Sequence, residues 1–396
     1  MGQESHKSQG EETEDTMKNL KTQSRLASLL TLILLACTAA YGQVTPSADT
    51  HTRKATITEF EAPGSGTGAY QGTFARDINP KGEIVGAYFD GNNRAHGFLR
   101  KLDGKFTRFE APGAGTGSGQ GTGVEGINPA GETTGLFNDG SNVHHGFVRK
   151  PNGRITAFDA PGAGTGANQG TLAENINSLG EIAGYYIDAN NAYHGFVRKP
   201  GGHITTVDVP GAGTGANQGT LICVQDCLSP TGWITGGYID ASNVDHGFLR
   251  DPDGKFTSFD APGAGTGSGQ GTLGGGIDPK GTITGYYVDS NGVNHGFRRT
   301  FDGKIKSINV KGAGTGSGQG TQAQDINVKG IAGDYIDANG VYHGFLMAHG
   351  VTRFDAPGAG TASGQGTFIG PNNPANAIAG YYVDGNNVYH GYLRTP

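Results

Sequence analysis

Seven histidines recur at one place in a repeated segment, and each is followed by Gly and then by Phe or Tyr. They are His96, His145, His194, His246, His295, His343 and His390. An imidazole can transfer protons or bind a metal ion near neutral pH. Catalysis normally needs one asymmetric constellation, and a metal site needs three or four convergent ligands, whereas each copy offers one His and one Asp. We therefore predict no catalytic residue, no metal and no cofactor. Each His is expected to bond a backbone carbonyl or the preceding Asp and to fix a turn.

A short segment rich in Asp and Asn precedes each of these His, as in Asp188-Ala189-Asn190. It is faintly similar to a calcium loop, but it is too short and lacks the distal Glu of an EF-hand. Asp and Asn commonly form turns, and loops on a rigid scaffold commonly carry binding residues. The candidate ligand-binding residues are therefore Asp90, Asn92, Asp188, Asn190, Asp240, Asn243, Asp289, Asn291, Asp337, Asn339, Asp384 and Asn386.

A glycine-rich run, DAPGAGTGANQGT at 159–171, looks like a phosphate-binding loop. Similar runs occupy 61–73, 110–122, 208–220, 260–272, 309–321 and 355–367. Such a run indicates a dinucleotide site only between a strand and a helix, and no copy here leads into a helical pattern. We therefore predict a tight connection in which several residues need positive φ, and no nucleotide.

Each repeat of about 49 residues contains four short segments that are typical of strands. In the third copy they span 171–177, 181–188, 193–199 and 203–209. Four strands in each repeat, with seven copies, predict an all-β fold, a seven-bladed β-propeller over 57–396. The region begins with a fourth strand at 57–62 and ends with a third strand at 390–394, so these two segments should pair and close the ring. The alternative is an open solenoid with two incomplete ends.

The order of strands predicts two different faces. The Asp/Asn turns should share one face with the glycine-rich runs, and this face is neutral to acidic. The opposite face is mildly basic, with residues such as Lys81, Arg100, Lys101 and Lys105. The first face is the better binding candidate. Tyr pairs, such as Tyr185-Tyr186, should point to opposite faces of a strand and pack between blades rather than act as sugar platforms.

The fourth copy departs from the pattern between Leu221 and Trp233. It is three residues longer than the usual copy. It also contains Cys223, Asp226, Cys227 and the single Trp of the chain. A unique site would lie here, although a drifted loop is the simpler interpretation. In an exported chain, two nearby cysteines favour a disulfide between Cys223 and Cys227, and zinc is the alternative.

The N-terminal residues 1–42 are typical of an extension followed by a signal peptide. Lys18, Lys21 and Arg25 precede an apolar stretch at 26–36, and Ala40-Tyr41-Gly42 offers a cleavage site before Gln43. Residues 43–56 are then a linker. A lipid anchor at Cys37 and an uncleaved anchor are the alternatives. We expect bacterial export, to a secreted, cell-surface or periplasmic location.

The His-Gly-Phe marker and the preceding INPxGEIxGYY-like segment resemble the HAF-type extracellular repeat family of bacteria. The resemblance covers about 57–396, and this chain has Gly where that family has Ala after the His. It implies export and a propeller-like fold, and it implies no catalytic residue.

Together these features predict an exported, non-enzymatic repeat protein that binds glycans or other surface molecules multivalently. The alternative is a carbohydrate-active enzyme, such as a propeller-type polysaccharide lyase that uses a Tyr and a His at the central channel. A purely structural or interaction module is a third reading. The net charge of −6 is mild for this length, and nothing suggests a nucleic-acid partner, which would favour a strongly basic face.

Overall fold

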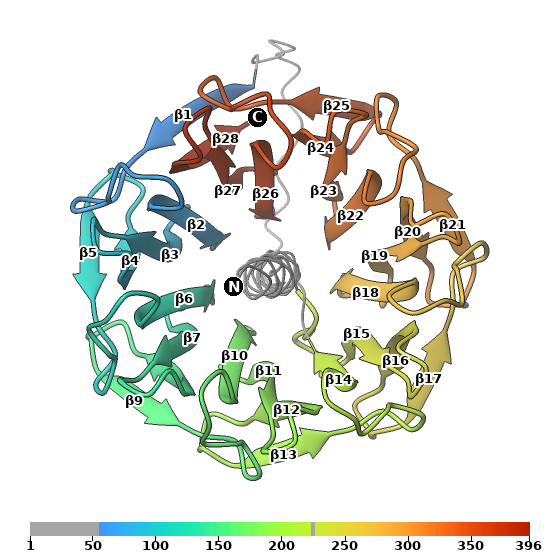
Figure 1. The fold of residues 1–396 in the computed structure, drawn as a ribbon, viewed down its shortest axis with the longest axis horizontal. Coiled ribbons are helices and arrows are strands. Elements are labelled where there is room, and N and C mark those ends of the chain that lie inside the picture. Colours follow the sequence, from blue (N-terminus) through green and yellow to red (C-terminus); the bar gives the residue numbers. More distant parts are fainter. Residues whose placement is uncertain (1–54, 223–225) are drawn as a thin grey trace, which may run out of the picture. The chain divides into compact units, whose positions relative to one another are not determined.

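The computed structural model describes residues 55–222 and 226–396. Every regular element in these residues is a β-strand, so the described part contains no helix that could cross a membrane. The 28 strands form one hydrogen-bonded sheet that closes on itself as an all-β, propeller-like ring (Figure 1). The closed all-β prediction is therefore confirmed. The proposed signal peptide and Cys37 lie outside the described residues, as does all of the linker except residues 55 and 56.

Antiparallel pairing groups the strands into sets of four. The first set contains β2 (Gly72–Ile78), β3 (Ile84–Phe89), β4 (Ala95–Arg100) and β5 (Phe106–Phe109). The second contains β6 (Gly121–Ile127), β7 (Thr133–Asn138), β8 (His144–Arg149) and β9 (Ile155–Phe158). The third contains β10 (Gly170–Ile176), β11 (Ile182–Ile187), β12 (Tyr193–Arg198) and β13 (Ile204–Val207). The fourth contains β14 (Gly219–Ile222), β15 (Ile234–Ile239), β16 (Asp245–Arg250) and β17 (Phe256–Phe259).

The remaining sets follow the same order. The fifth contains β18 (Gly271–Ile277), β19 (Ile283–Val288), β20 (Asn294–Arg299) and β21 (Ile305–Ile308). The sixth contains β22 (Gly320–Asn327), β23 (Gly330–Ile336), β24 (Tyr342–Met347) and β25 (Val351–Phe354). The last contains β26 (Gly366–Asn372), β27 (Ile378–Val383), β28 (Tyr389–Thr395) and β1 (Thr56–Phe60).

The two ends of the repeat region complete one set. Strand β1 pairs antiparallel with β28, from Thr56 opposite Thr395 to Phe60 opposite Gly391. Phe60 packs edge-to-face on Phe98, with ring centroids 6.5 Å apart. The predicted pairing of 57–62 with 390–394 is confirmed, although the strand ends at Phe60 rather than at residue 62. The ring therefore has no unpaired end strand among the described residues.

One glycine in each glycine-rich run allows neighbouring sets to approach closely. Gly121 has a φ of 113° and forms a parallel bridge with Ala95 of the preceding set. A Cβ at Gly121 would lie 2.0 Å from the carbonyl oxygen of Ala95, so no other residue fits. The same bridge recurs between the other sets, which makes the hydrogen-bonded sheet continuous.

Aromatic residues of the repeated marker form the core between sets. The ring that follows His-Gly is fully buried in every copy: Phe98, Phe147, Phe196, Phe248, Phe297, Phe345 and Tyr392. An exposed fraction of 0% in all seven places explains why the marker recurs, since each side chain fills the same space. The second strands are also enclosed, and every residue of β11 is buried.

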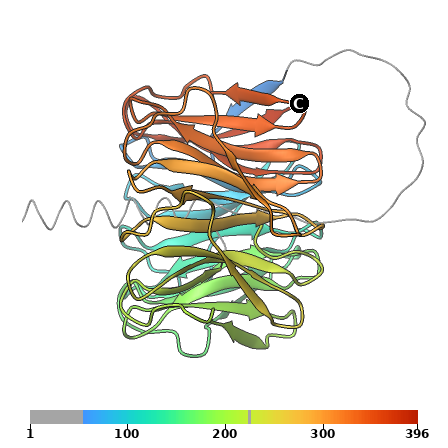
Figure 2. The same ribbon diagram turned by 90° about the vertical axis from the view of Figure 1, so that its right-hand side faces the viewer.

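The strands run between two faces of the ring, so turns and connections gather at both faces (Figure 2). Arg100 was predicted on the mildly basic face, but its guanidinium does not lie free in solvent. The Arg100 guanidinium lies over the Phe60 ring, 4.6 Å from its centroid, and burial lowers its pKa. Arg100 is therefore part of the packing between two sets.

Candidate functional site

The Asp of each short turn is held by its own backbone. Asp188 Oδ1 accepts hydrogen bonds from the amides of Asn190 and Ala192, each at 2.8 Å. Partial burial opposes ionisation, but these amide bonds dominate and lower the pKa of Asp188. The same geometry and the same direction of pKa are found at Asp90, Asp240, Asp289, Asp337 and Asp384. One oxygen of each carboxylate is thus committed to the turn.

The glycine-rich run lies against these turns. Gln169 Oε1 accepts the Gly166 amide at 2.9 Å, and its Nε2 donates to Asn191 Oδ1 at 3.0 Å. The Asn168 amide donates to the Asn142 carbonyl in the preceding set. Because one run touches the turns of two sets, the prediction that runs and turns share a face is confirmed. The run is a structural connector, as its Gly content indicated.

Each marker His lies between two acidic positions and over a ring. His194 Nδ1 is 3.1 Å from Asp208 Oδ2, and its Nε2 is 3.7 Å from Asp188 Oδ2. Its imidazole stacks on Tyr186 with centroids 4.8 Å apart. In five of the other copies, the place of Asp208 is taken by Glu61, Glu110, Asp159, Asp260 or Asp355, and beside His295 it is taken by the neutral Asn309. The stacked ring is Tyr88, Phe137, Tyr238, Tyr287, Tyr335 or Tyr382.

The strand register produces this arrangement. Tyr186 on β11 is directly opposite His194 on β12. Gly195 is opposite Val207 on β13, so Asp208, one residue beyond the strand, continues that register toward His194. The ring and the carboxylate therefore flank the His as cross-strand neighbours. The sequence analysis identified the His and the turn Asp but missed this second carboxylate.

The second carboxylate is the most accessible polar group of the site. The Asp208 side chain is 49% exposed and the Asp159 side chain 54%, whereas that of His194 is 26% exposed. In the copy that contains Glu61, a hydrogen bond that His390 donates to this Glu, aided by the turn Asp384, raises the pKa of His390 against the effect of partial burial. Each site thus presents carboxylate oxygens and an imidazole edge to solvent.

Of the twelve predicted ligand-binding residues, the six Asp hold the turns as described above, and the six Asn differ in their contacts. Asn190 and its equivalents Asn291, Asn339 and Asn386 turn their side chains back to Oδ2 of the turn Asp, at 3.2 to 3.5 Å. Asn92 supplies its amide to Asp90. Asn243 stands one place later, at a φ of 62°, and accepts from Gln218. These contacts account for turn formation, and ligand binding by these residues stays a prediction.

The paired tyrosines point in different directions. Tyr186 lies under His194, whereas Tyr185 packs edge-to-face on Tyr193. In the last set, Tyr381 stacks on Phe74 of the first set at 3.8 Å. The predicted packing between sets is therefore observed for Tyr381. Tyr185 and Tyr186 are both buried, so neither offers an open ring face.

The structure does not bring the unusual residues of the fourth copy into one site. Trp233 packs edge-to-face on Phe301, with centroids 5.4 Å apart. Asp226 is buried and lies 3.5 Å from Asn175 Nδ2. Cys227 is buried, but Cys223 lies outside the described residues, so their disulfide stays a prediction.

Several acidic side chains of the inner strands were not anticipated. Burial raises the pKa of Asp77, Glu125, Glu174 and Asp226. The Arg76 guanidinium pairs with Glu125 at 3.2 Å. Among the described residues, no group of three or more His, Cys, Asp or Glu side chains could hold a metal ion. These carboxyl groups are thus buried polar groups of the ring interior.

No protein-family model matches the chain, and no curated protein matches it. Solved structures do match its fold. The BP39L lectin from Burkholderia pseudomallei has a TM-score of 0.53 and 9% identity, and the match covers 81% of this chain and 96% of that one. Two further matches are a prolyl endopeptidase and the SapL1 lectin in complex with alpha methyl fucoside. The endopeptidase has a TM-score of 0.47 and 10% identity and covers 83% of this chain and 46% of that one. SapL1 has a TM-score of 0.41 and 13% identity, and the match covers 70% of this chain and 94% of that one. The likeness to BP39L supports the fold. The TM-scores of the other two are below 0.5, so nothing is concluded from them.

Proposed function

We propose that this protein is an exported, non-enzymatic, multivalent binding module whose ligand is a glycan. In this proposal each four-stranded set is one blade of a seven-bladed propeller and contributes one copy of the site. The observation that carries the proposal is the repetition of a half-exposed carboxylate beside a His edge on one face of the ring. The fold likeness to the BP39L lectin supports a carbohydrate as the ligand class.

The charge of the site favours a neutral or amino sugar over an acidic one. Six of the seven copies place two carboxylates around one His, and the other, at His295, has Asn309 in place of the second carboxylate. Carboxylate oxygens accept hydrogen bonds from sugar hydroxyls, and they repel uronic acids or sulfates. A ligand with several repeating sugars would engage several copies at once, so weak single sites would give strong retention.

The repetition also argues against catalysis. A lyase would need one copy with distinct groups, but the carboxylate, His and ring recur with the same register in copy after copy. The tyrosines under the His are buried against the imidazole and are not open to a substrate.

A glycan array with matched variants tests the proposal. Asn309 is a natural precedent for Asn beside the His, so Asp159→Asn, Asp208→Asn, Asp260→Asn and Asp355→Asn should fold. We expect the wild type to be retained on neutral or amino glycans, one substitution to weaken retention partly, and all four to weaken it steeply. Lys101→Ala on the opposite face is the control and should change nothing. Retention lost entirely with a single substitution, or kept with all four, would contradict the proposal.

A further inference from the structure

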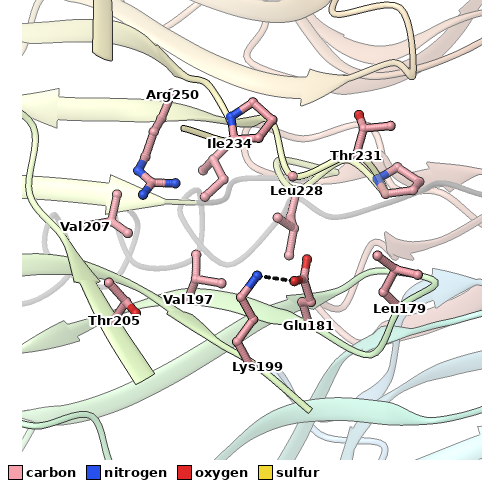
Figure 3. Close-up of a pocket in the computed structure, with 13 residues that line it drawn as sticks. Leu179, Glu181, Val197, Lys199, Thr205, Val207, Leu228, Thr231, Ile234 and Arg250 are labelled. Atoms are coloured by element: carbon pink, nitrogen blue, oxygen red, sulfur yellow. Dashed lines mark hydrogen bonds and ion pairs between the residues drawn. The ribbon is translucent and has the colours of Figure 1, made fainter. Parts of the chain in front are cut away.

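A cavity of about 330 Å³ opens between the third and fourth sets, on the face opposite the glycine-rich runs (Figure 3). Its apolar wall is formed by Val197 and Val207 of the third set and by Leu228 and Ile234 of the fourth. Lys199, Glu181, Thr205, Thr231 and Arg250 supply its polar groups. This volume lies at the lower end of the ~300–1,000 Å³ range of small-molecule sites.

The cavity lies at a place where one aromatic side chain of the repeat is missing. At five junctions the fourth strand of one set ends with a Phe whose ring lies under an Arg of the next set. These pairs are Phe60 with Arg100, Phe109 with Arg149, Phe158 with Arg198, Phe259 with Arg299 and Phe354 with Arg394, at 4.6 to 4.9 Å. At the junction of the third and fourth sets, the Phe position is occupied by Val207.

Arg250 consequently has no ring of the preceding set beneath it. Its guanidinium lies 5.9 Å from the ring of Phe256, a neighbour in its own set. The five stacked arginines are shielded, and burial lowers the pKa of each. No carboxylate among the described residues forms an ion pair with Arg250. Lys199, in contrast, is neutralised by its ion pair with Glu181 (Figure 3).

We propose that this cavity binds a small aromatic carboxylate, whose ring takes the place of the missing Phe beside Val207 and whose anionic group pairs with Arg250. The wall of Val197, Leu228 and Ile234 provides the apolar contact for the ring. A guanidinium can stack on an aromatic ring and also bond a carboxylate through two N–H groups. This site is separate from the repeated His–carboxylate face and does not depend on the function proposed for it.

Two substitutions with precedents in the chain test the site. Val207→Phe restores the residue found at five other junctions and should fill the cavity. Its matched control is Ile308→Phe, which restores the same Phe at the junction of the fifth and sixth sets. Arg250→Met copies Met347, the residue at the Arg position of that junction, and removes the positive charge without shortening the side chain greatly.

The measurement is isothermal titration of the full chain with 3-phenylpropionate, with 3-phenylpropanol and cyclohexanepropionate as comparison probes. We expect saturable binding of one 3-phenylpropionate per chain, and weaker binding of both comparison probes. Val207→Phe should abolish binding and Ile308→Phe should preserve it. Arg250→Met should weaken 3-phenylpropionate by about tenfold or more, because a charged hydrogen bond contributes that much, and should weaken 3-phenylpropanol less, because the alcohol loses only the stacking of its ring on the guanidinium.

The proposal is overturned if the wild type shows no saturable binding at millimolar 3-phenylpropionate, or if Val207→Phe binds as well as the wild type. Equal weakening of the acid and the alcohol by Arg250→Met would also overturn the role of the charge. If Val207→Phe does not fold, two other measurements still test the proposal. They are competition between the probes on the wild type, and the comparison of acid and alcohol binding by Arg250→Met.

Discussion

Closure of the ring by β1 can be tested with one core substitution. Phe60 is 9% exposed, contacts Phe98 and lies under Arg100. A Phe→Ala change at such a buried position costs about 3–5 kcal/mol of unfolding free energy. For a fold of about 340 residues, an unfolding entropy of about 2.1 cal/mol/K per residue gives about 0.7 kcal/mol/K. Phe60→Ala should therefore lower the thermal midpoint by about 4–7 °C.

The matched variant is Phe109→Ala, which removes the equivalent ring between the first and second sets. In a closed ring the two substitutions remove the same contacts, so calorimetry should give similar losses. Thr58→Ala, at an exposed position of β1, is the control and should change the unfolding free energy by no more than about 0.5 kcal/mol. Closure would be refuted if Phe60→Ala left the thermal midpoint unchanged while Phe109→Ala lowered it, because β1 would then not be packed in solution.

Three further predictions concern pH and backbone geometry. The hydrogen bond that His390 donates to Glu61 raises the pKa of His390 above its ordinary 6.5, so its contribution to stability is complete below pH 6.5 and is lost as pH rises through the higher folded-state value. Glu61→Gln should flatten the fall of the thermal midpoint above pH 6.5, and an unchanged slope would contradict this. Burial raises the pKa of Asp77, so stability is lost as pH rises from its ordinary 3.8 toward the folded-state value. Asp77→Asn should then unfold at an equal or higher urea concentration at pH 7, and a lower midpoint would be the contrary result. Gly121→Ala should cost about 1–3 kcal/mol for its positive φ alone, and more because the new Cβ would lie 2.0 Å from the Ala95 carbonyl oxygen. Gly140→Ala, with open space around it, should cost little, and equal urea midpoints would refute the steric argument.

The repeat made most of the fold predictable. Strands of four to eight residues recur with the marker, and the incomplete ends of the repeat region predicted the pairing of β1 with β28. The observed strands of the third set begin and end within two residues of the predicted ones. A repeated sequence fixes a repeated structure because each set packs only on its neighbours.

The site was harder to predict because it depends on register across three strands. Asp208 follows His194 by 14 residues, and Asp355 follows His343 by 12, since the turn between the two strands is shorter there. A fixed spacing in sequence therefore misses a pair that the hairpin register keeps constant. The cavity was missed for another reason: Val207 is unremarkable alone, and it matters only when compared with the Phe at the same place in other copies.

The stoichiometry of glycan binding tests the proposed function most directly. A monovalent sugar identified on the array should be titrated against the wild type and against the variant with Asn in place of Asp159, Asp208, Asp260 and Asp355. We predict about six equivalent sites per chain in the wild type, one for each copy with two carboxylates around the His, and a loss of the four substituted sites in the variant. A single site per chain, or the same stoichiometry in both proteins, would contradict it.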